Sequence, residues 1–124
     1  MLIPAPRTRR STTFEVTTTS EATVVTATGD LDLAVTGRLG ALLNRELQLA
    51  PPALVFDASA VTFCSARVLT ILLDAASAGV PFAVAGRCRS LLRPIVALGL
   101  DELLAVHWSV DEALAWLKLV PQLP

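Results

Sequence analysis

The sequence predicts an α/β fold in which a mixed β-sheet is flanked by helices, with the element order ββαβαβαβα. Three observations lead to this prediction. Two segments rich in β-branched residues come first along the chain. After them, helical periodicity alternates with short continuous apolar runs, which is typical of parallel strands joined by crossover helices. Hydrophobic residues make up 53% of the chain and charged residues 17%, so the chain has ample material for one core.

The first two strands are predicted at residues 14–19 and 23–28, where Val and Thr are concentrated. Residues 20–22 between them suit a hairpin turn, so this pair is expected to be antiparallel. Gly29 is expected to end the second strand.

The first helix is predicted to begin near Leu33 and to end before the prolines at 51 and 52. Its apolar positions recur at helical spacing: Val35, Leu39, Leu42, Leu43 and Leu47. Residues 53–56 form a short apolar run of the buried-strand type.

A second helix is predicted around the apolar face of Val68, Leu69, Leu72, Ala75 and Ala76, with Gly79 beyond its end. Residues 81–85 are predicted to form the next buried strand, which Gly86 closes. The third helix is expected to be capped by Ser90 and to end at Gly99, with Pro94 in its first turn.

The last strand is predicted at residues 103–108. Ser109 and Glu112 have the spacing of a capping box, which predicts a terminal helix from 110 to about 119. With 124 residues the chain is long enough for one domain. We expect a flexible arm at 1–13, the domain at 14–120 and a tail at 121–124.

Composition argues against several classes of function. The net charge is −1 without a basic stripe, which disfavours nucleic-acid binding. One histidine and no Cys-x-x-Cys pair disfavour a metal site, and no cofactor is predicted. No apolar run approaches the roughly 18 residues of a membrane span, and residues 1–13 lack the apolar core of a secretory signal. The expected location is the cytoplasm.

Candidate functional residues follow the strands of the parallel part of the sheet. Because parallel strands end at one edge, segments 29–32, 57–67 and 86–89 are expected to converge there. Asp30 and Asp32 lead into the first helix, where a carboxylate can cap the helix or form part of a site. Ser65 is similarly either an N-cap or a functional hydroxyl.

Arginines and cysteines at the same edge suggest two further possibilities. Arg67 lies at the positive end of a helix dipole, where a cation is unfavourable, so a bound anion or a partner's carboxylate would explain why an arginine occurs there. Arg87 and Arg89 are expected at the same edge and could belong to the same anion site, although this signal is weak. Cys64 and Cys88 are expected to end adjacent parallel strands, where their Cα atoms could lie close enough for a disulfide. The simpler interpretation is that they are two semi-buried thiols without a function.

Four motifs in one register resemble those of STAS domains. Gly29-Asp30-Leu31-Asp32 is similar to the family's G-E-L-D, and residues 57–64 are similar to D-L-S-x-V-x-F followed by a hydrophobic residue. Residues 98–101 resemble L-x-G-L, and residues 109–114 resemble the S-x-x-E-A start of the last helix. The resemblance covers about residues 14–119 and implies the fold predicted above.

The small single-domain members of this family are anti-sigma factor antagonists of bacterial transcription regulation and stress response. The resemblance implies docking on an anti-sigma factor, a GHKL-type serine kinase, with release of the sigma factor it held. The family's phosphorylation motif D-S-[ST]-G-L aligns with Ser65, Ala66, Arg67, Val68 and Leu69, so the acceptor positions carry no hydroxyl. Asp32 matches the aspartate beside that motif.

We therefore expect a non-enzymatic binding module with a degenerate phosphorylation loop and with Ser65 as a displaced acceptor. Its partner surface is predicted to include Asp30, Asp32, Ser65, Ala66 and Arg67, and a homodimer is possible. The alternative is a STAS scaffold that senses a ligand or redox state, binding a small anion or nucleotide at the same edge.

Overall fold

The computed structural model describes residues 11–119, and it confirms the predicted α/β class and element order. The strands are β1 (Thr13–Thr18), β2 (Thr23–Leu31), β3 (Leu54–Cys64), β4 (Phe82–Ala85) and β5 (Val106–His107). The helices are α1 (Leu33–Gln48), α2 (Ala66–Ala76), α3 (Arg89–Ala97) and α4 (Val110–Leu119), with a 3-10 turn at Leu100–Glu102. Most of the predicted arm and the whole predicted tail lie outside the described residues.

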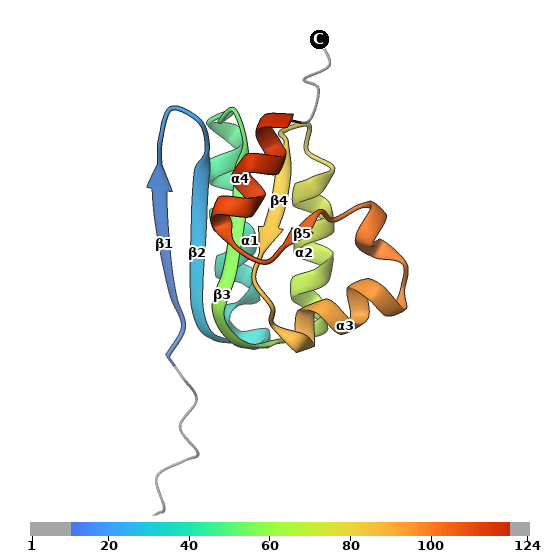
Figure 1. The fold of residues 1–124 in the computed structure, drawn as a ribbon. Coiled ribbons are helices and arrows are strands. Elements are labelled where there is room, and N and C mark those ends of the chain that lie inside the picture. The colour runs from blue at the N-terminus through green and yellow to red at the C-terminus, as the bar shows by residue number, and fades with distance from the viewer. Residues whose placement is uncertain (1–10, 120–124) are drawn as a thin grey trace, which may run out of the picture.

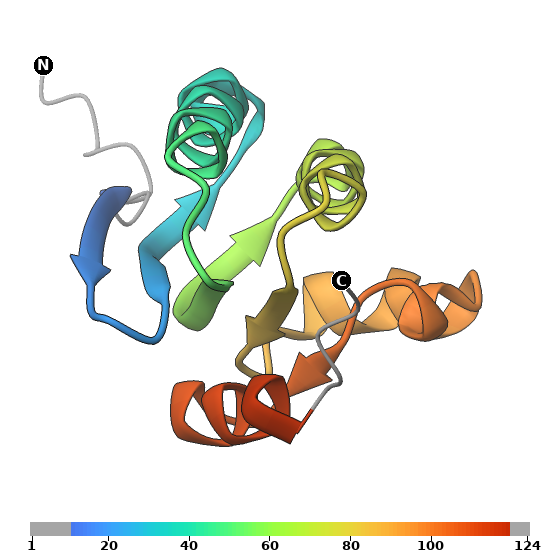
Figure 2. The same ribbon diagram turned by 90° about the horizontal axis from the view of Figure 1, so that it is seen from above.

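The five strands form one sheet in the order β1-β2-β3-β4-β5. β1 pairs antiparallel with β2, and every other neighbouring pair is parallel. Helices α1 and α2 cover one face and α4 covers the other, as Figures 1 and 2 show. The sheet is therefore mixed and flanked by helices, as predicted.

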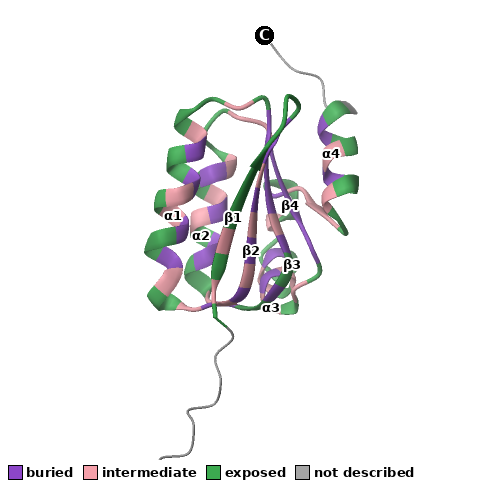
Figure 3. Cartoon of the chain, turned by 90° about the vertical axis from the view of Figure 1, so that its left-hand side faces the viewer, coloured by how far each residue is buried: buried purple, intermediate pink, exposed green. Residues whose placement is uncertain are grey.

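The core is divided by the sheet into two unequal parts. The larger part packs β2, β3 and β4 against α1, α2 and α3 around Phe56 and Leu72, both fully buried. The smaller part is built mainly from alanines and seats α4 through Ala113 and Leu117. Figure 3 shows the resulting burial, with much of β2, β3 and β4 buried between α1 and α2 on one side and α4 on the other, while the edge strand β1 is largely exposed.

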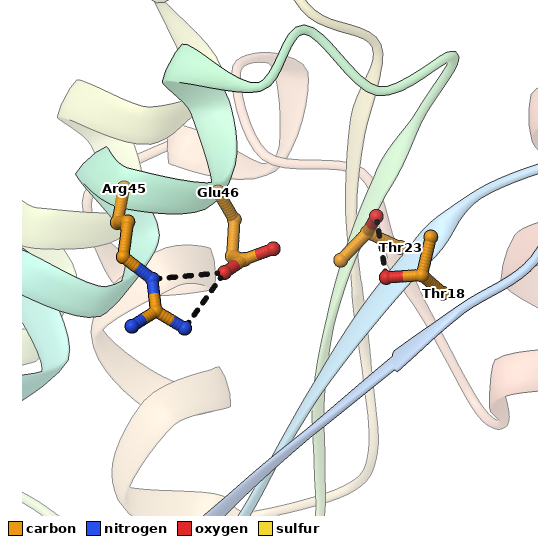
Figure 4. A network of polar contacts seen from close by, with 4 residues as sticks. All are labelled: Thr18, Thr23, Arg45 and Glu46. Carbon is orange, nitrogen blue, oxygen red and sulfur yellow. Dashed lines mark hydrogen bonds and ion pairs between the residues drawn. The ribbon is translucent and has the colours of Figure 1, made fainter.

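A polar cluster lies at the end of the core where the parallel strands begin. Glu46 of α1 is only 4% exposed, and the Nε and Nη2 atoms of Arg45 both lie 3.3 Å from its Oε2 atom. Thr23 is also buried, and its hydroxyl lies 3.5 Å from that of Thr18 (Figure 4). Because a buried charge is costly unless paired, we assign the Arg45–Glu46 contact a structural role, at the end of the sheet opposite the candidate site.

Three predicted boundaries are wrong. The second strand continues through Gly29 to Leu31, and β3 continues past Phe56 to Cys64. This extension pairs with β2 alone, because β4 ends at Ala85 opposite Asp57. The predicted strand at 103–108 is observed only at Val106–His107, because the backbone N–H groups of Leu103 and Leu104 both donate to the carbonyl of Leu100 in the preceding 3-10 turn.

The start of α3 also differs from the prediction. Its N-cap residue is Cys88 rather than Ser90, and the Ser90 hydroxyl instead accepts a hydrogen bond from the backbone N–H of Cys64. Pro94 therefore lies beyond the first turn, inside the helix, where it cannot donate to the carbonyl four residues earlier.

Candidate functional site

The ends of β2 and β3 lie side by side at the edge where the parallel strands end. Leu31 pairs with Cys64, and the backbone N–H of Ser65 donates to the carbonyl of Leu31 over 2.8 Å. The helices α1 and α2 both start at this edge, at the bottom of Figure 1. This geometry places Asp32 and Ser65 on the wall of one surface hollow.

The two carboxylates at this edge have different surroundings. Asp32 is the N-cap of α1, and its Oδ1 atom accepts a hydrogen bond from the backbone N–H of Ala34 over 3.1 Å. Asp30 lies in β2 and accepts a hydrogen bond from the Thr62 hydroxyl of β3. Asp32 therefore stabilises the first turn of α1, and Asp30 joins the two extended strands.

Ser65 occupies the N-cap position of α2 without acting as a side-chain cap. Its backbone carbonyl accepts the N–H of Val68 over 3.1 Å, but its hydroxyl makes no capping hydrogen bond. The Oγ atom is inaccessible and has no hydrogen-bond partner among the described residues. Phosphorylation of Ser65 would therefore require its side chain to rotate outward. The next two residues, Ala66 and Arg67, are exposed.

Replacing this serine is expected to have an unusual effect. An N-cap serine replaced by alanine ordinarily loses about 1 kcal/mol of stability. Ser65→Ala removes no cap bond and deletes a buried hydroxyl without a partner among the described residues, so we expect a change of less than about 0.5 kcal/mol or a slight gain. Urea unfolding followed by circular dichroism measures this difference.

Asp32→Ala is the matched control, because it removes a cap hydrogen bond that is present, and it should cost about 1 kcal/mol. A loss for Ser65→Ala as large as that for Asp32→Ala would show that the Ser65 hydroxyl is in fact stabilising.

Two exposed apolar side chains border the hollow. Leu33, the first residue of α1, is 71% exposed, and Phe63, near the end of β3, is 47% exposed. The hollow has a volume of about 330 Å³ and is lined by Asp32, Leu33, Ala34, Phe63 and Ser65. It combines an apolar surface with a carboxylate.

Leu33 and Phe63 are not among the site residues predicted from sequence. In the sequence Leu33 marks only where helical spacing begins, and Phe63 is only part of a motif. Phe63 could have been found if the β3 extension had been recognised, because it precedes the buried Cys64 and so points to the other side of the strand.

The three arginines are not joined by any contact between described side chains. The guanidinium of Arg87 lies over the Trp108 ring, 4.4 Å from its centroid, beside β5. Arg67 lies on the first turn of α2, and Arg89 is the first residue of α3. An anion site formed by Arg67, Arg87 and Arg89 therefore stays a prediction.

The remaining polar groups do not form a metal site. Among residues 11–119 there is no group of three or more side chains suited to holding a metal ion. Nδ1 of His107 lies 3.4 Å from Glu112, and its ring packs on Trp116 with centroids 5.1 Å apart. His107 thus serves to pack β5 against α4.

No helix in the described part of the chain is long and apolar enough to cross a membrane.

This chain is similar to a known protein family and to several solved structures. A family model described as "Mlab, STAS domain" matches residues 14–105. The crystal structure of an anti-sigma factor antagonist from Mycobacterium paratuberculosis is similar, with 29% identity, a TM-score of 0.80 and coverage of 87% of this chain and 95% of that one. The comparison with curated proteins finds no match.

More distant structures share the fold. The Bacillus cell fate determinant SpoIIAA in its phosphorylated form has 14% identity and a TM-score of 0.67, covering 84% of this chain and 98% of that one. A sulfate transporter family protein from Wolinella succinogenes has 21% identity and a TM-score of 0.65, covering 80% and 86%.

Proposed function

The chain belongs to the STAS domain family, and from this premise we propose that it is an anti-sigma factor antagonist-like binding module. It docks on an anti-sigma factor of the GHKL serine kinase type and thereby frees a sigma factor. The docking surface comprises Asp30, Asp32, Leu33, Phe63, Ser65, Ala66 and Arg67. In this role the protein is not an enzyme and acts in the cytoplasm, where transcription takes place.

The exposed pair Leu33 and Phe63 is the observation that carries this proposal. A fully buried Leu or Phe side chain contributes roughly 1.5–3 kcal/mol relative to its exposed state. Because Leu33 is 71% and Phe63 is 47% exposed, covering both with a partner would supply roughly 2–3.5 kcal/mol in total. The fully buried core of a protein–protein interface is more apolar than the rest of the surface and is enriched in aromatic residues, and the rim around it is polar. Asp32 and Arg67 provide such polar surroundings, one of each charge.

The Mycobacterium paratuberculosis antagonist supports the same role, because the similarity extends over most of both chains. The phosphorylated SpoIIAA structure shows that a protein of this fold can carry a phosphate. In the present chain Ala66 and Arg67, which align with the acceptor positions of the family's phosphorylation motif, have no hydroxyl. We propose that docking here is not controlled by phosphorylation at those positions.

Binding to the anti-sigma factors of the source organism tests this function. We expect one of them to bind the purified protein, and we expect Phe63→Asp to weaken that binding by roughly 100-fold, because it places a carboxylate in a desolvated contact. Isothermal titration calorimetry measures both affinities.

Val96→Asp is the matched control. Val96 is an exposed apolar residue on α3, 69% accessible and outside the proposed surface, so its replacement should leave affinity within about threefold. Absence of binding to every anti-sigma factor would contradict the function, and equal losses for the two variants would contradict the surface.

A further inference from the structure

Two free thiols lie together beside the docking surface, and the proposed function does not use them. Cys64 is the last residue of β3 and directly precedes Ser65, while Cys88 is the N-cap residue of α3. The two cysteines are far apart in sequence and come from different elements. The fold therefore brings them together at the junction of β3 and α3.

Direct contacts fix this proximity. The Ser90 hydroxyl accepts the backbone N–H of Cys64 over 2.9 Å, and the same oxygen lies 3.2 Å from Sγ of Cys88. Burial is the main cause that raises the pKa of the Cys64 thiol, and the charge of Cys88 and a hydrogen bond to its side chain raise it further.

The two cysteines differ in accessibility. Cys64 is 5% exposed, whereas Cys88 is half-buried and is flanked by Arg87 and Arg89. An oxidant from solvent therefore reaches Cys88 first. Cys64 is the neighbouring thiol, because its backbone N–H and the Cys88 sulfur both contact the Ser90 hydroxyl.

We propose that Cys64 and Cys88 are a redox-modifiable pair that forms a reversible intramolecular disulfide with a hydroperoxide as oxidant. The sulfur of Cys88 attacks one peroxide oxygen, so that an S–O bond forms, the O–O bond breaks and water (or an alcohol, from an organic hydroperoxide) is released after protonation. The sulfur of Cys64 then loses its proton and attacks the sulfur of Cys88, so that the S–S bond forms, the S–O bond breaks and the hydroxyl leaves as water after protonation. Overall, the two sulfurs lose two electrons, and the hydroperoxide accepts them.

The disulfide would connect the end of β3 to the start of α3. The conformational constraint would extend to the docking surface, because Cys64 directly precedes Ser65 in the chain and pairs with Leu31 in the sheet. The formation of the disulfide does not depend on the proposed docking function, so the two can be tested separately.

Mass spectrometry of the reduced native protein treated with hydrogen peroxide tests the proposal. We expect the monomer to lose two hydrogen atoms, a cross-linked peptide containing Cys64 and Cys88 to appear, and dithiothreitol to reverse both changes. In Cys64→Ala, the sulfenic acid at Cys88 should persist and react with dimedone, because no second thiol is available to resolve it. Cys88→Ala should incorporate little dimedone.

Two results would overturn the proposal. Dimedone labelling of Cys88 in wild-type protein equal to that in Cys64→Ala would show that Cys64 does not resolve the sulfenic acid. Disulfides found only between two chains would also be incompatible with an intramolecular pair.

Discussion

Gly86→Ala is expected to lower the free energy of unfolding by roughly 3–5 kcal/mol, a large part of the stability of a domain of this size. Gly86 follows β4 with φ of +124°, a conformation that residues with a side chain rarely adopt. A Cβ atom there would lie 2.7 Å from the carbonyl carbon of Ala58 and 2.8 Å from the nitrogen of Ser59. These are backbone atoms of β3, at the irregularity where Ala58 and Ser59 lie between Asp57 and Ala60, the residues paired with β2. Backbone atoms cannot rotate away from the new Cβ atom as the end of a flexible side chain can.

Alanine variants of two other glycines distinguish the clash with β3 from backbone strain as the cause of this loss of stability. Gly79→Ala places a side chain at φ of +89° with open space around it, so it should lose only about 1 kcal/mol from backbone strain. Gly37→Ala lies in α1, also in open space, and should gain about 0.5–1 kcal/mol of helix stability. Urea unfolding of the three variants provides the comparison. A loss for Gly86→Ala no larger than that for Gly79→Ala would contradict the predicted clash with β3.

The order of elements could be predicted from sequence because each element carries its own local pattern. The Val and Thr residues of β1 and β2, and the helical spacing around Leu39 and Leu72, identify these segments without knowledge of their neighbours. The extension of β3 could not be identified in this way. Many of its residues after Phe56 are small or polar, and they are extended because β2 is there to pair with them.

The candidate site was likewise predictable only in part. The parallel topology was enough to expect Asp32 and Ser65 near each other, because both follow strands that end at one edge. The exposure of Leu33 and Phe63 arises because none of the described helices covers them, which local sequence does not encode. The inaccessibility of the Ser65 hydroxyl depends on its side-chain conformation, which residue type does not determine. Residue type was enough to predict that Ser65 occupies the N-cap position.

The second large effect is expected from Ala66→Ser, and it rests on the proposed function. Ala66 is the exposed first residue of α2, and it matches the family's acceptor position. With the cognate anti-sigma factor kinase and ATP, the wild-type protein should incorporate almost no phosphate, because residues 66 and 67 lack hydroxyls and that of Ser65 is inaccessible. Ala66→Ser should approach one phosphate per chain, measured by intact mass.

The phosphate introduced by that variant should also weaken docking. It adds a charge of about −2 at the N-terminus of α2, where the helix dipole tolerates it, so the fold should be retained. The same charge would need to be desolvated beside Phe63 and Asp32 in the complex, so we expect affinity to fall by about tenfold or more. The double variant Ser65→Ala/Ala66→Ser should behave in the same way if the hydroxyl introduced at position 66 is the acceptor. Phosphate on Ser65 of the wild-type chain at similar stoichiometry would instead show that the switch is displaced by one residue and that the buried hydroxyl rotates out to meet the kinase.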